Sequence, residues 1–290
     1  MTFLKGICNN RVREIRYPKI PYSVSETLLP QLIAIAKAAG QGIMTLYNQP
    51  AGNVVLKADQ SPLTEADLMS NQIIVNALAR LTPDLPILSE ESAAIPYLQR
   101  AGWERFWLVD PLDGTKEFIK HNGEFTVNIA LIDHGNPVLG VVHAPALNIS
   151  YSGAMGQGAF VERQQQGAER IHITPRNAQD PLKIVASRSH RDARTSALLD
   201  HLGRHECISM GSSLKFCLVA EGRAHFYPRL GPTMEWDTAA AHAVVNAAGG
   251  KVCDLSGEAL RYNKADLHNP EFFVLGNADH ALLSALQNYL

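Results

Sequence analysis

Hydrophobic residues recur at helical spacing in two parts of the first third of the chain. They return every three or four positions over residues 25–47 and again over 65–81, where Thr82-Pro83 ends the pattern. This spacing predicts two helices, each with one buried face. Between them, residues 53–57 read as a strand, and the sequence SPLT predicts a turn.

Shorter apolar runs predict strands in the region that follows. Such runs occupy residues 86–88, 106–110, 125–132 and 137–143. The sequence DHGN separates the last two runs and is typical of a hairpin turn. The first half of the chain is therefore expected to combine helices with antiparallel strands.

After a Gln-rich stretch at residues 164–167, the pattern changes to strands that alternate with helices. The expected strands are 183–187, 207–209 and 224–228, and the expected helices are 195–202, 214–221 and 238–248. This alternation is typical of α/β structure and suggests a boundary near residue 180. A chain of 290 residues can form one large domain or two packed sub-domains that share a core. The expected division is 1–22, 23–180 and 181–290.

The overall composition excludes several classes of protein. Hydrophobic residues make up 46%, charged residues 19%, and the formal net charge is -2. These values are ordinary for a soluble globular protein and argue against a disordered, fibrous or membrane-spanning chain. They give no indication of a nucleic-acid partner. The four cysteines form no CxxC pair, so we expect free thiols, a reducing compartment and a cytoplasmic location.

The first 22 residues form a basic leader with five Lys or Arg against one Glu. The leader lacks the apolar stretch of a secretory signal, so we expect a poorly ordered segment. Organelle targeting or association with the inner face of a membrane is the alternative.

The stretch WLVDPLDGTKEF places two acids three residues apart at the expected end of a strand. Asp110 would end that strand, Pro111 would turn the chain, and Asp113 would return beside Asp110 with the Leu112 carbonyl between them. Three hard oxygens within one turn suit a magnesium-type ion. Gly114 and Thr115 follow at an expected helix start, where backbone N–H groups favour an anion. A cation and a phosphate can therefore share one site.

Each acid at an element end also has a structural interpretation. Asp113-Gly114 fits a simple turn, and Asp110 fits a helix cap. Glu90 fits a solvated loop, and Asp237 lies in the helix N-terminal region that acids prefer. Asp67 completes a pattern that resembles a capping box with Thr64, with Asp in place of the usual Glu or Gln.

Three motifs in order resemble the lithium-sensitive, magnesium-dependent inositol monophosphatase superfamily. They are LSEES (88–92), WLVDPLDGTKEF (107–118) and EWDTAAAHAVVNAAGG (235–250), and the likeness spans about residues 25–285. The resemblance implies a layered α-β-α-β-α sandwich like that of inositol monophosphatase and fructose-1,6-bisphosphatase. LKADQSPLTEAD, SRSH, GSSLKFCLVAEGRA and YPRLGPTMEWDTAA are similar to the 3'(2'),5'-bisphosphate nucleotidase branch.

The resemblance implies a two-metal phosphatase mechanism. Glu90, Asp110, the Leu112 carbonyl and Asp113 would hold the first magnesium, and Asp110, Asp113 and Asp237 the second. A third, weaker ion near Glu90 and inhibition by lithium are also implied. Thr115 and Asp67 would orient and deprotonate a metal-activated water that attacks the phosphomonoester in line, without a phosphoenzyme.

The implied substrate is adenosine 3',5'-bisphosphate, converted to AMP and phosphate, with the sulfated nucleotide of sulfur assimilation as a further substrate. The reacting phosphate would contact the metal-site residues Glu90, Leu112, Asp113, Gly114, Thr115 and Asp237. The rest of the substrate would contact Ser187, His190, Ser213, Lys215 and Arg229. Without the resemblance, Lys215 and Arg229 read as surface residues, and His201 and His205 read as an exposed pair or two ligands of a metal.

Two positions depart from the branch, and two other functions remain open. His225 stands where an acid is usual, and Ala241 where a glycine is frequent; His225 could change the charge near the nucleotide. The alternative functions are an inositol monophosphatase or related sugar-phosphate phosphatase, and a non-catalytic metal-binding regulator.

Overall fold

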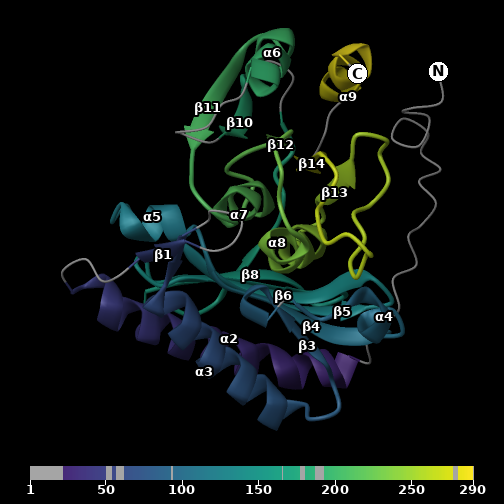
Figure 1. Ribbon diagram of the computed structural model, residues 1–290. Coiled ribbons are helices and arrows are strands. Elements are labelled where there is room, and N and C mark those ends of the chain that lie inside the picture. Colours follow the sequence, from purple (N-terminus) through teal and green to yellow (C-terminus); the bar gives the residue numbers. More distant parts are fainter. Residues whose placement is uncertain are drawn as a thin grey trace.

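The computed structural model describes residues 22–49, 54–56, 62–92, 94–164, 166–176, 180–186, 193–276 and 280–289. Its elements stack in five layers, which alternate helices and sheets (Figure 1). The α-β-α-β-α sandwich implied by the motifs is therefore confirmed. Within the described parts of the chain, no helix is both long and apolar enough to cross a membrane.

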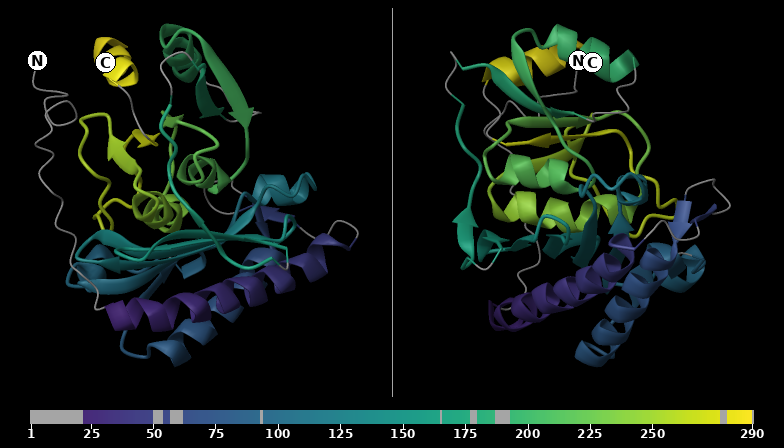
Figure 2. Two further views of the ribbon diagram at one scale, coloured as in Figure 1. Left: turned by 180° about the vertical axis from the view of Figure 1, so that it is seen from behind. Right: turned by 90° about the vertical axis from the view of Figure 1, so that its left-hand side faces the viewer.

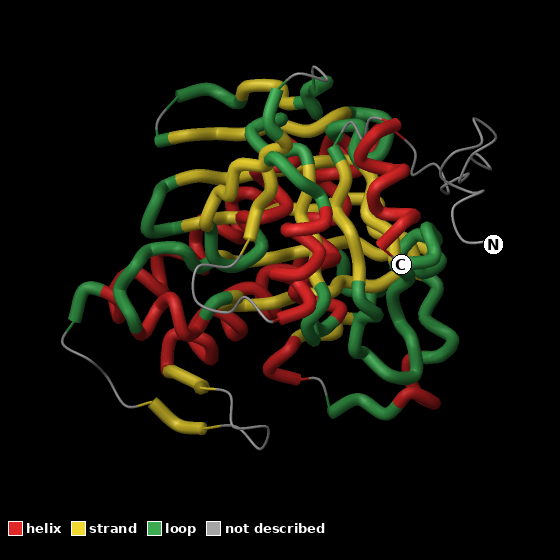
Figure 3. The backbone as a smooth tube through the Cα atoms, turned by 90° about the horizontal axis from the view of Figure 1, so that it is seen from above, coloured by secondary structure: helices red, strands yellow, loops and turns green. Residues whose placement is uncertain are grey.

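The first layer contains the two helices expected from the hydrophobic spacing. They are α2 (Tyr22–Tyr47) and α3 (Glu65–Leu81), and they lie together on the outer face of the larger sheet (Figure 2). β1 (Val54–Leu56) pairs antiparallel with β2 (Pro62–Thr64) at the rim of the molecule (Figure 3). The expected turn at SPLT is wrong for Pro62–Thr64, because Pro is tolerated as the first residue of a strand that pairs here with β1.

The larger sheet has seven strands in the order β3 to β9. They are β3 (Ile87–Ser89), β4 (Arg105–Asp113), β5 (Thr126–Asp133), β6 (Asn136–Ala144), β7 (Ile149–Ala154), β8 (Gly158–Arg163) and β9 (Glu169–Ile171). All neighbours pair antiparallel except β3 and β4. The expected hairpin at DHGN is confirmed, and both central residues of its turn, His134 and Gly135, have positive φ. The short helices η1 (Glu90–Ser92), α4 (Tyr97–Arg100) and α5 (Thr115–Ile119) flank this sheet.

The smaller sheet has five strands in the order β11-β10-β12-β14-β13. They are β10 (Leu182–Ala186), β11 (His205–Ser209), β12 (Phe226–Arg229), β13 (Lys251–Asp254) and β14 (Phe272–Leu275). β10 pairs parallel with β11 and β12, as expected from alternation, whereas β14 pairs antiparallel with β12 and β13. α6 (Ala193–His201) and α9 (His280–Tyr289) form the outer layer.

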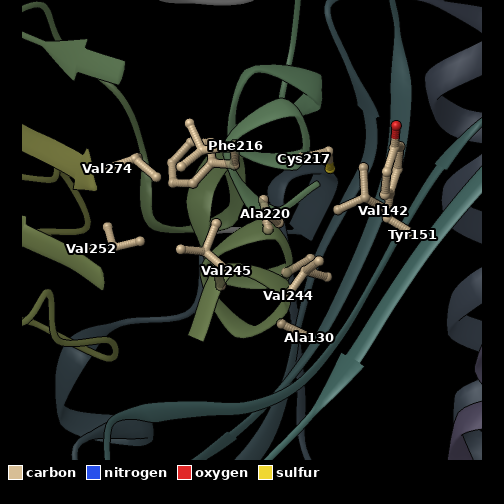
Figure 4. Close-up of a cluster of buried hydrophobic side chains, with 14 of the residues drawn as sticks. Ala130, Val142, Tyr151, Phe216, Cys217, Ala220, Val244, Val245, Val252 and Val274 are labelled. Atoms are coloured by element: carbon tan, nitrogen blue, oxygen red, sulfur yellow. The ribbon is translucent and has the colours of Figure 1, made fainter. Parts of the chain in front are cut away.

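α7 (Leu214–Ala220) and α8 (Glu235–Ala247) lie between the two sheets and are buried along most of their length. Figure 4 shows their side chains between strands of both sheets, with Val244 near Ala130 and Phe216 near Val274. One hydrophobic cluster therefore joins both sheets. The larger sheet ends at β9 and the smaller sheet begins at β10, on either side of residue 180. The division of the chain into sub-domains at this residue remains a prediction.

The structure shows the state of the cysteines and of the histidine pair His201 and His205. Cys207, Cys217 and Cys253 are free thiols, as expected, whereas Cys8 and the leader up to residue 21 lie outside the described residues. His201 ends α6 and His205 begins β11, so they do not share a helix. One ring nitrogen of each histidine contacts a backbone carbonyl oxygen, His201 Nε2 that of Ala285 and His205 Nδ1 that of Gly203.

Candidate active site

A β-bulge brings Asp110 and Asp113 to one face of the larger sheet. Side chains alternate along a strand, so residues three apart would normally point to opposite faces. Asp110 pairs with Asn128 and Asp113 with Thr126, so two residues of β4 stand opposite one residue of β5. The extra residue restores the common face. The expected end of the strand at Asp110 is therefore wrong: β4 continues to Asp113, and Pro111, which has no N–H to donate, lies in the bulge.

Asp67 reaches the same region from the first turn of α3. The capping box with Thr64 is confirmed: Asp67 Oδ2 accepts hydrogen bonds from Thr64 N (2.8 Å) and Thr64 Oγ1 (2.6 Å). Asp67 Oδ1 accepts one from Thr115 Oγ1 at 3.3 Å. Thr115 begins α5 directly after Gly114, whose φ of 92° is easily adopted only by glycine. The structure thus brings Asp67 and Thr115 together across 48 residues.

Asp237 and Glu90 come from two further elements. Asp237 lies in the first turn of α8, where its Oδ2 accepts a hydrogen bond from Met234 N at 2.9 Å. Glu90 begins η1 immediately after the buried strand β3 and is partly exposed.

The five carboxylates interact electrostatically. Burial raises the pKa of Asp110 well above its usual value, and the negative charges of Glu90, Asp113, Asp237 and Asp67 raise it further. Asp110 is only 1% exposed. Burial and Asp113 likewise raise the pKa of Asp237, while the Met234 N–H opposes that shift. Such crowding of like charge is unfavourable without a nearby cation.

The donor set fits a hard divalent cation in composition and charge. Its ligands would all be oxygens, and a cation would relieve the repulsion around Asp110. Among the residues that the structure describes, however, no three acid, His or Cys side chains lie close enough together to hold a metal ion as they stand. Asp67, Asp110, Asp113 and Asp237 also accept hydrogen bonds from nearby protein donors, including Leu112 N on Asp110 at 3.1 Å. The assignment of individual ligands therefore remains a prediction.

Asp113 is held by the loop that precedes α7. Its Oδ2 accepts hydrogen bonds from Ser212 Oγ, Ser213 N and Ser213 Oγ, each at 2.6 Å. The Ser213 hydroxyl also contacts Asn128 Nδ2 at 2.7 Å and Thr126 Oγ1 at 2.9 Å. Ser213, expected to contact substrate, is 2% exposed and here binds a neighbouring acid. Sequence reasoning missed Ser212, Thr126 and Asn128; the motif GSS was a local signal for Ser212, whereas no local signal marked Thr126 or Asn128.

Lys215 and Arg229 lie near these acids; Lys215 is buried, unlike the surface residue that the sequence alone suggests, and Arg229 is partly exposed. Lys215 is 9% exposed, and its Nζ lies 5.7 Å from the centroid of the Tyr227 ring. Burial lowers the pKa of Lys215 to about 8, with Asp113 opposing the shift and Arg229 adding to it. Arg229 ends β12, and its Nη2 donates to the Pro232 carbonyl at 2.8 Å. The pair gives this end of the site two cations beside the acids.

The remaining predicted positions lie apart from this group or outside the described residues. Ser187 and His190 fall outside the described residues. His225 is buried, and its Nδ1 accepts a hydrogen bond from Lys183 N at 3.0 Å, which fits a neutral ring and adds no charge to the site. Ala241 packs in the core around α8.

A layered sandwich with acids gathered at the bulge of β4 and at the starts of α3, η1 and α8 is the arrangement that the comparisons assign to a family of phosphatases. The inositol monophosphatase family matches residues 25–290, and the chain belongs to this family. It is 52% identical over 250 residues to the 3'(2'),5'-bisphosphate nucleotidase CysQ of Escherichia coli K12, which covers 85% of this chain and 99% of that protein.

Two solved structures share the fold. CysQ from Bacteroides thetaiotaomicron, described as a bacterial member of the inositol monophosphatase family, has a TM-score of 0.77 and 43% identity over 89% of this chain and 99% of its own. The extragenic suppressor protein suhB from Bartonella henselae has a TM-score of 0.75 and 26% identity over 90% of this chain and 98% of its own. The resemblance stated from the motifs is confirmed.

Proposed function

We propose that this protein is a magnesium-dependent phosphomonoesterase that hydrolyses adenosine 3',5'-bisphosphate to AMP and phosphate. One observation carries the proposal: the buried Asp110 lies among four other carboxylates, and the buried cation Lys215 lies near one of them, Asp113. The acids would bind divalent cations, which in turn would bind the reacting phosphate. The nearby Lys215 would bind an anion, so the two groups together suit a substrate with two phosphates. The similarity to nucleotidases over most of the chain supports the same choice.

The residues that would hold two magnesium ions are those implied by the motifs. Glu90, Asp110, the Leu112 carbonyl and Asp113 would hold one ion, and Asp110, Asp113 and Asp237 the other, with a third, weaker ion near Glu90. Bound magnesium would supply positive charge to the phosphoryl oxygens and lower the pKa of the attacking water. Lithium would inhibit by replacing one ion.

The Asp67–Thr115 pair would handle the proton of the attacking water. Both donors from Thr64 bind Asp67 Oδ2, and the Thr115 hydroxyl binds Oδ1. When the water oxygen attacks phosphorus, Thr115 would orient it and Asp67 would accept its proton. The bond from phosphorus to the leaving nucleotide oxygen breaks on the opposite side, this oxygen takes a proton from solvent water to become the hydroxyl of AMP, and no bond to the protein forms.

The second phosphate would bind at Lys215 and Arg229. Among the described residues, no side chain or carbonyl accepts a hydrogen bond from the Lys215 ammonium, although the residue is almost fully buried. A phosphate oxygen would give this largely buried cation a charge-assisted hydrogen bond. Arg229 would add a second cation, and Ser187 and His190 remain predicted contacts on this side.

The test compares substrates on one purified protein. Phosphate release is measured with adenosine 3',5'-bisphosphate, its sulfated form and inositol 1-phosphate, each with magnesium and with or without lithium. We expect the bisphosphate to give a higher kcat/KM than inositol 1-phosphate. A strong preference for inositol 1-phosphate would overturn the proposed substrate, and no release from any phosphomonoester would favour a non-catalytic metal-binding protein.

A further inference from the structure

Glu235, the first residue of α8, has an ionisable side chain with no exposed surface. Burying a carboxylate is costly unless strong hydrogen-bond donors compensate. Glu235 Oε2 accepts a hydrogen bond from Asn263 N at 2.6 Å, and Oε1 accepts one from Lys264 N at 2.9 Å. The Lys264 ammonium also donates to Oε1. All three donors belong to the loop between β13 and β14.

Arg100 holds the same loop from its other side. This residue ends α4 and is 2% exposed. Its guanidinium donates to Asn263 Oδ1 at 2.9 Å, to the Lys264 carbonyl at 2.6 Å and to the Ala265 carbonyl at 3.1 Å. Asn263 Nδ2 donates back to the Arg100 carbonyl at 2.7 Å. The loop is therefore fixed between a buried arginine and a buried glutamate.

Backbone hydrogen bonds extend this contact to the residues before α8. Glu235 N donates to the Leu267 carbonyl at 2.9 Å, and Asn269 N donates to the Thr233 carbonyl at 2.8 Å. Asn269 Nδ2 donates to the Met234 carbonyl at 2.7 Å. The start of α8 thus depends on the loop for its position.

An acid in the first turn of a helix is stabilised by the helix dipole even when it is exposed. That interaction does not require the complete burial of Glu235 or its three donors from a distant loop. Asp237, two residues later, is oriented by Met234 N, which lies in the segment that the loop fixes. A shift of the first turn would therefore move the Asp237 carboxylate.

We propose that Glu235 is a positioning residue, which locks the first turn of α8 to residues 263–265 and so fixes Asp237 for magnesium binding. The inference rests on the proposed function only in taking Asp237 as a magnesium ligand. Its readout is therefore magnesium affinity rather than turnover.

The test measures magnesium binding to the full-length protein by isothermal titration calorimetry. Glu235→Gln keeps the side-chain shape but removes the charge and turns an N–H₂ group toward donors. Because outer partners of metal ligands typically change affinity by 10- to 100-fold, we expect the magnesium Kd to rise about 10-fold. Lys264→Met, which alters a partly exposed side chain, should raise the Kd in the same direction but less, by about 3-fold.

Asp133→Asn is the matched control. Asp133 is also a buried carboxylate, paired with Arg105 and His134, but it ends β5 far along the strand from Thr126. Its loss should lower the melting temperature and leave the magnesium Kd unchanged. An unchanged Kd in Glu235→Gln, or in Lys264→Met if the first variant does not fold, would overturn the inference alone. A wild-type protein that binds no magnesium would instead overturn the proposed function and this inference with it.

Discussion

Lys215 illustrates how a single side chain can decide between substrates. The residue is only 9% exposed and lies beside Arg229 and near Asp113, so its charge is held in an environment that favours the neutral form. An anion that binds here interacts more strongly with the ammonium than it would on the surface, because little water competes for the cation. Substrate choice in the proposed reaction should therefore depend strongly on this residue.

Lys215→Ala should weaken the use of the bisphosphate more than that of a nucleotide with one phosphate. A hydrogen bond to a charged group contributes about 1.5–3 kcal/mol, so kcat/KM for adenosine 3',5'-bisphosphate should fall by roughly 10- to 100-fold. The measurement is kcat/KM for the bisphosphate and for 3'-AMP in parallel. Equal losses on both substrates would show that Lys215 does not contact the second phosphate.

The preference for the bisphosphate should also depend on pH. Burial lowers the pKa of Lys215 from 10.5 to about 8, so its ammonium loses a proton as the pH rises through about 8. The kcat/KM for the bisphosphate should decline above this pH relative to that for 3'-AMP, because kcat/KM reports the free enzyme. Lys215→Arg keeps its charge in this range and should lose the decline.

The folded protein binds fewer protons than the unfolded chain between about pH 8 and 10.5, so Lys215 by itself makes the free energy of unfolding increase across that interval.

At the scale of elements, close contact between α8 and the larger sheet requires residues without side chains. A Cβ atom at Gly140 on β6 would lie 2.2 Å from the Ala240 carbonyl oxygen, and one at Gly153 on β7 would lie 2.8 Å from Val244 Cα. Neither glycine has positive φ, so the need is for space rather than for an unusual backbone. The close contact of these glycines with the backbone of α8 sets the distance between α8 and the larger sheet. It therefore also sets the position of Asp237 relative to the bulge of β4.

Gly140→Ala should destabilise the fold by about 1–3 kcal/mol, because the added methyl group must push the backbone of α8 away. Urea unfolding of the variant and the wild type measures the loss. Gly102→Ala is the control: a Cβ there meets nothing within 4 Å, and its φ is not positive. Its unfolding free energy should stay within about 1 kcal/mol of the wild type. If both variants unfold alike, the α8 contact is not the reason for glycine at residue 140.

The elements with long periodic patterns were predictable from the sequence. α3 has the expected bounds, and the hairpin at DHGN follows from its turn residues. β7 and β8 were missed because Ser, Gly and Ala interrupt their apolar alternation; β13 and β14 were also missed. The bulge was also missed, because it depends on pairing with β5 rather than on any local pattern.

The acids of the candidate site could be identified from the sequence because they belong to motifs. The residues that hold these acids in place could not. Asp67 and Asp237 stand at helix starts that the sequence reveals. The contacts of Thr126 with Ser213 and of Glu235 with Asn263 join residues far apart in the chain, so no local pattern indicates them. Burial of Lys215 was likewise invisible, since a lysine is usually exposed.

At the scale of the whole molecule, magnesium should stabilise the fold. The acids around Asp110 repel one another in the folded state and separate on unfolding, so a cation should bind the folded state preferentially. At 100 times its Kd, a ligand adds about 2.7 kcal/mol to the unfolding free energy.

The melting temperature should therefore rise by several degrees on addition of magnesium chloride, with sodium chloride of equal ionic strength as the control. Asp113→Asn should reduce this rise and nearly abolish turnover, because one anionic ligand becomes neutral. A full magnesium-dependent rise in Asp113→Asn would remove Asp113 from the set of ligands.

The shared core has a consequence for how this protein is made. Asp67, Asp113 and Asp237 emerge from the ribosome at widely separated times, and the helix that carries Asp237 fills the space between the two sheets. A nascent or prematurely terminated chain that lacks this helix leaves one face of the larger sheet uncovered and the acid group incomplete. The protein should therefore bind its metal late in synthesis. Fragments that end before α8 should expose the apolar face of the larger sheet, which favours aggregation, and should have no activity.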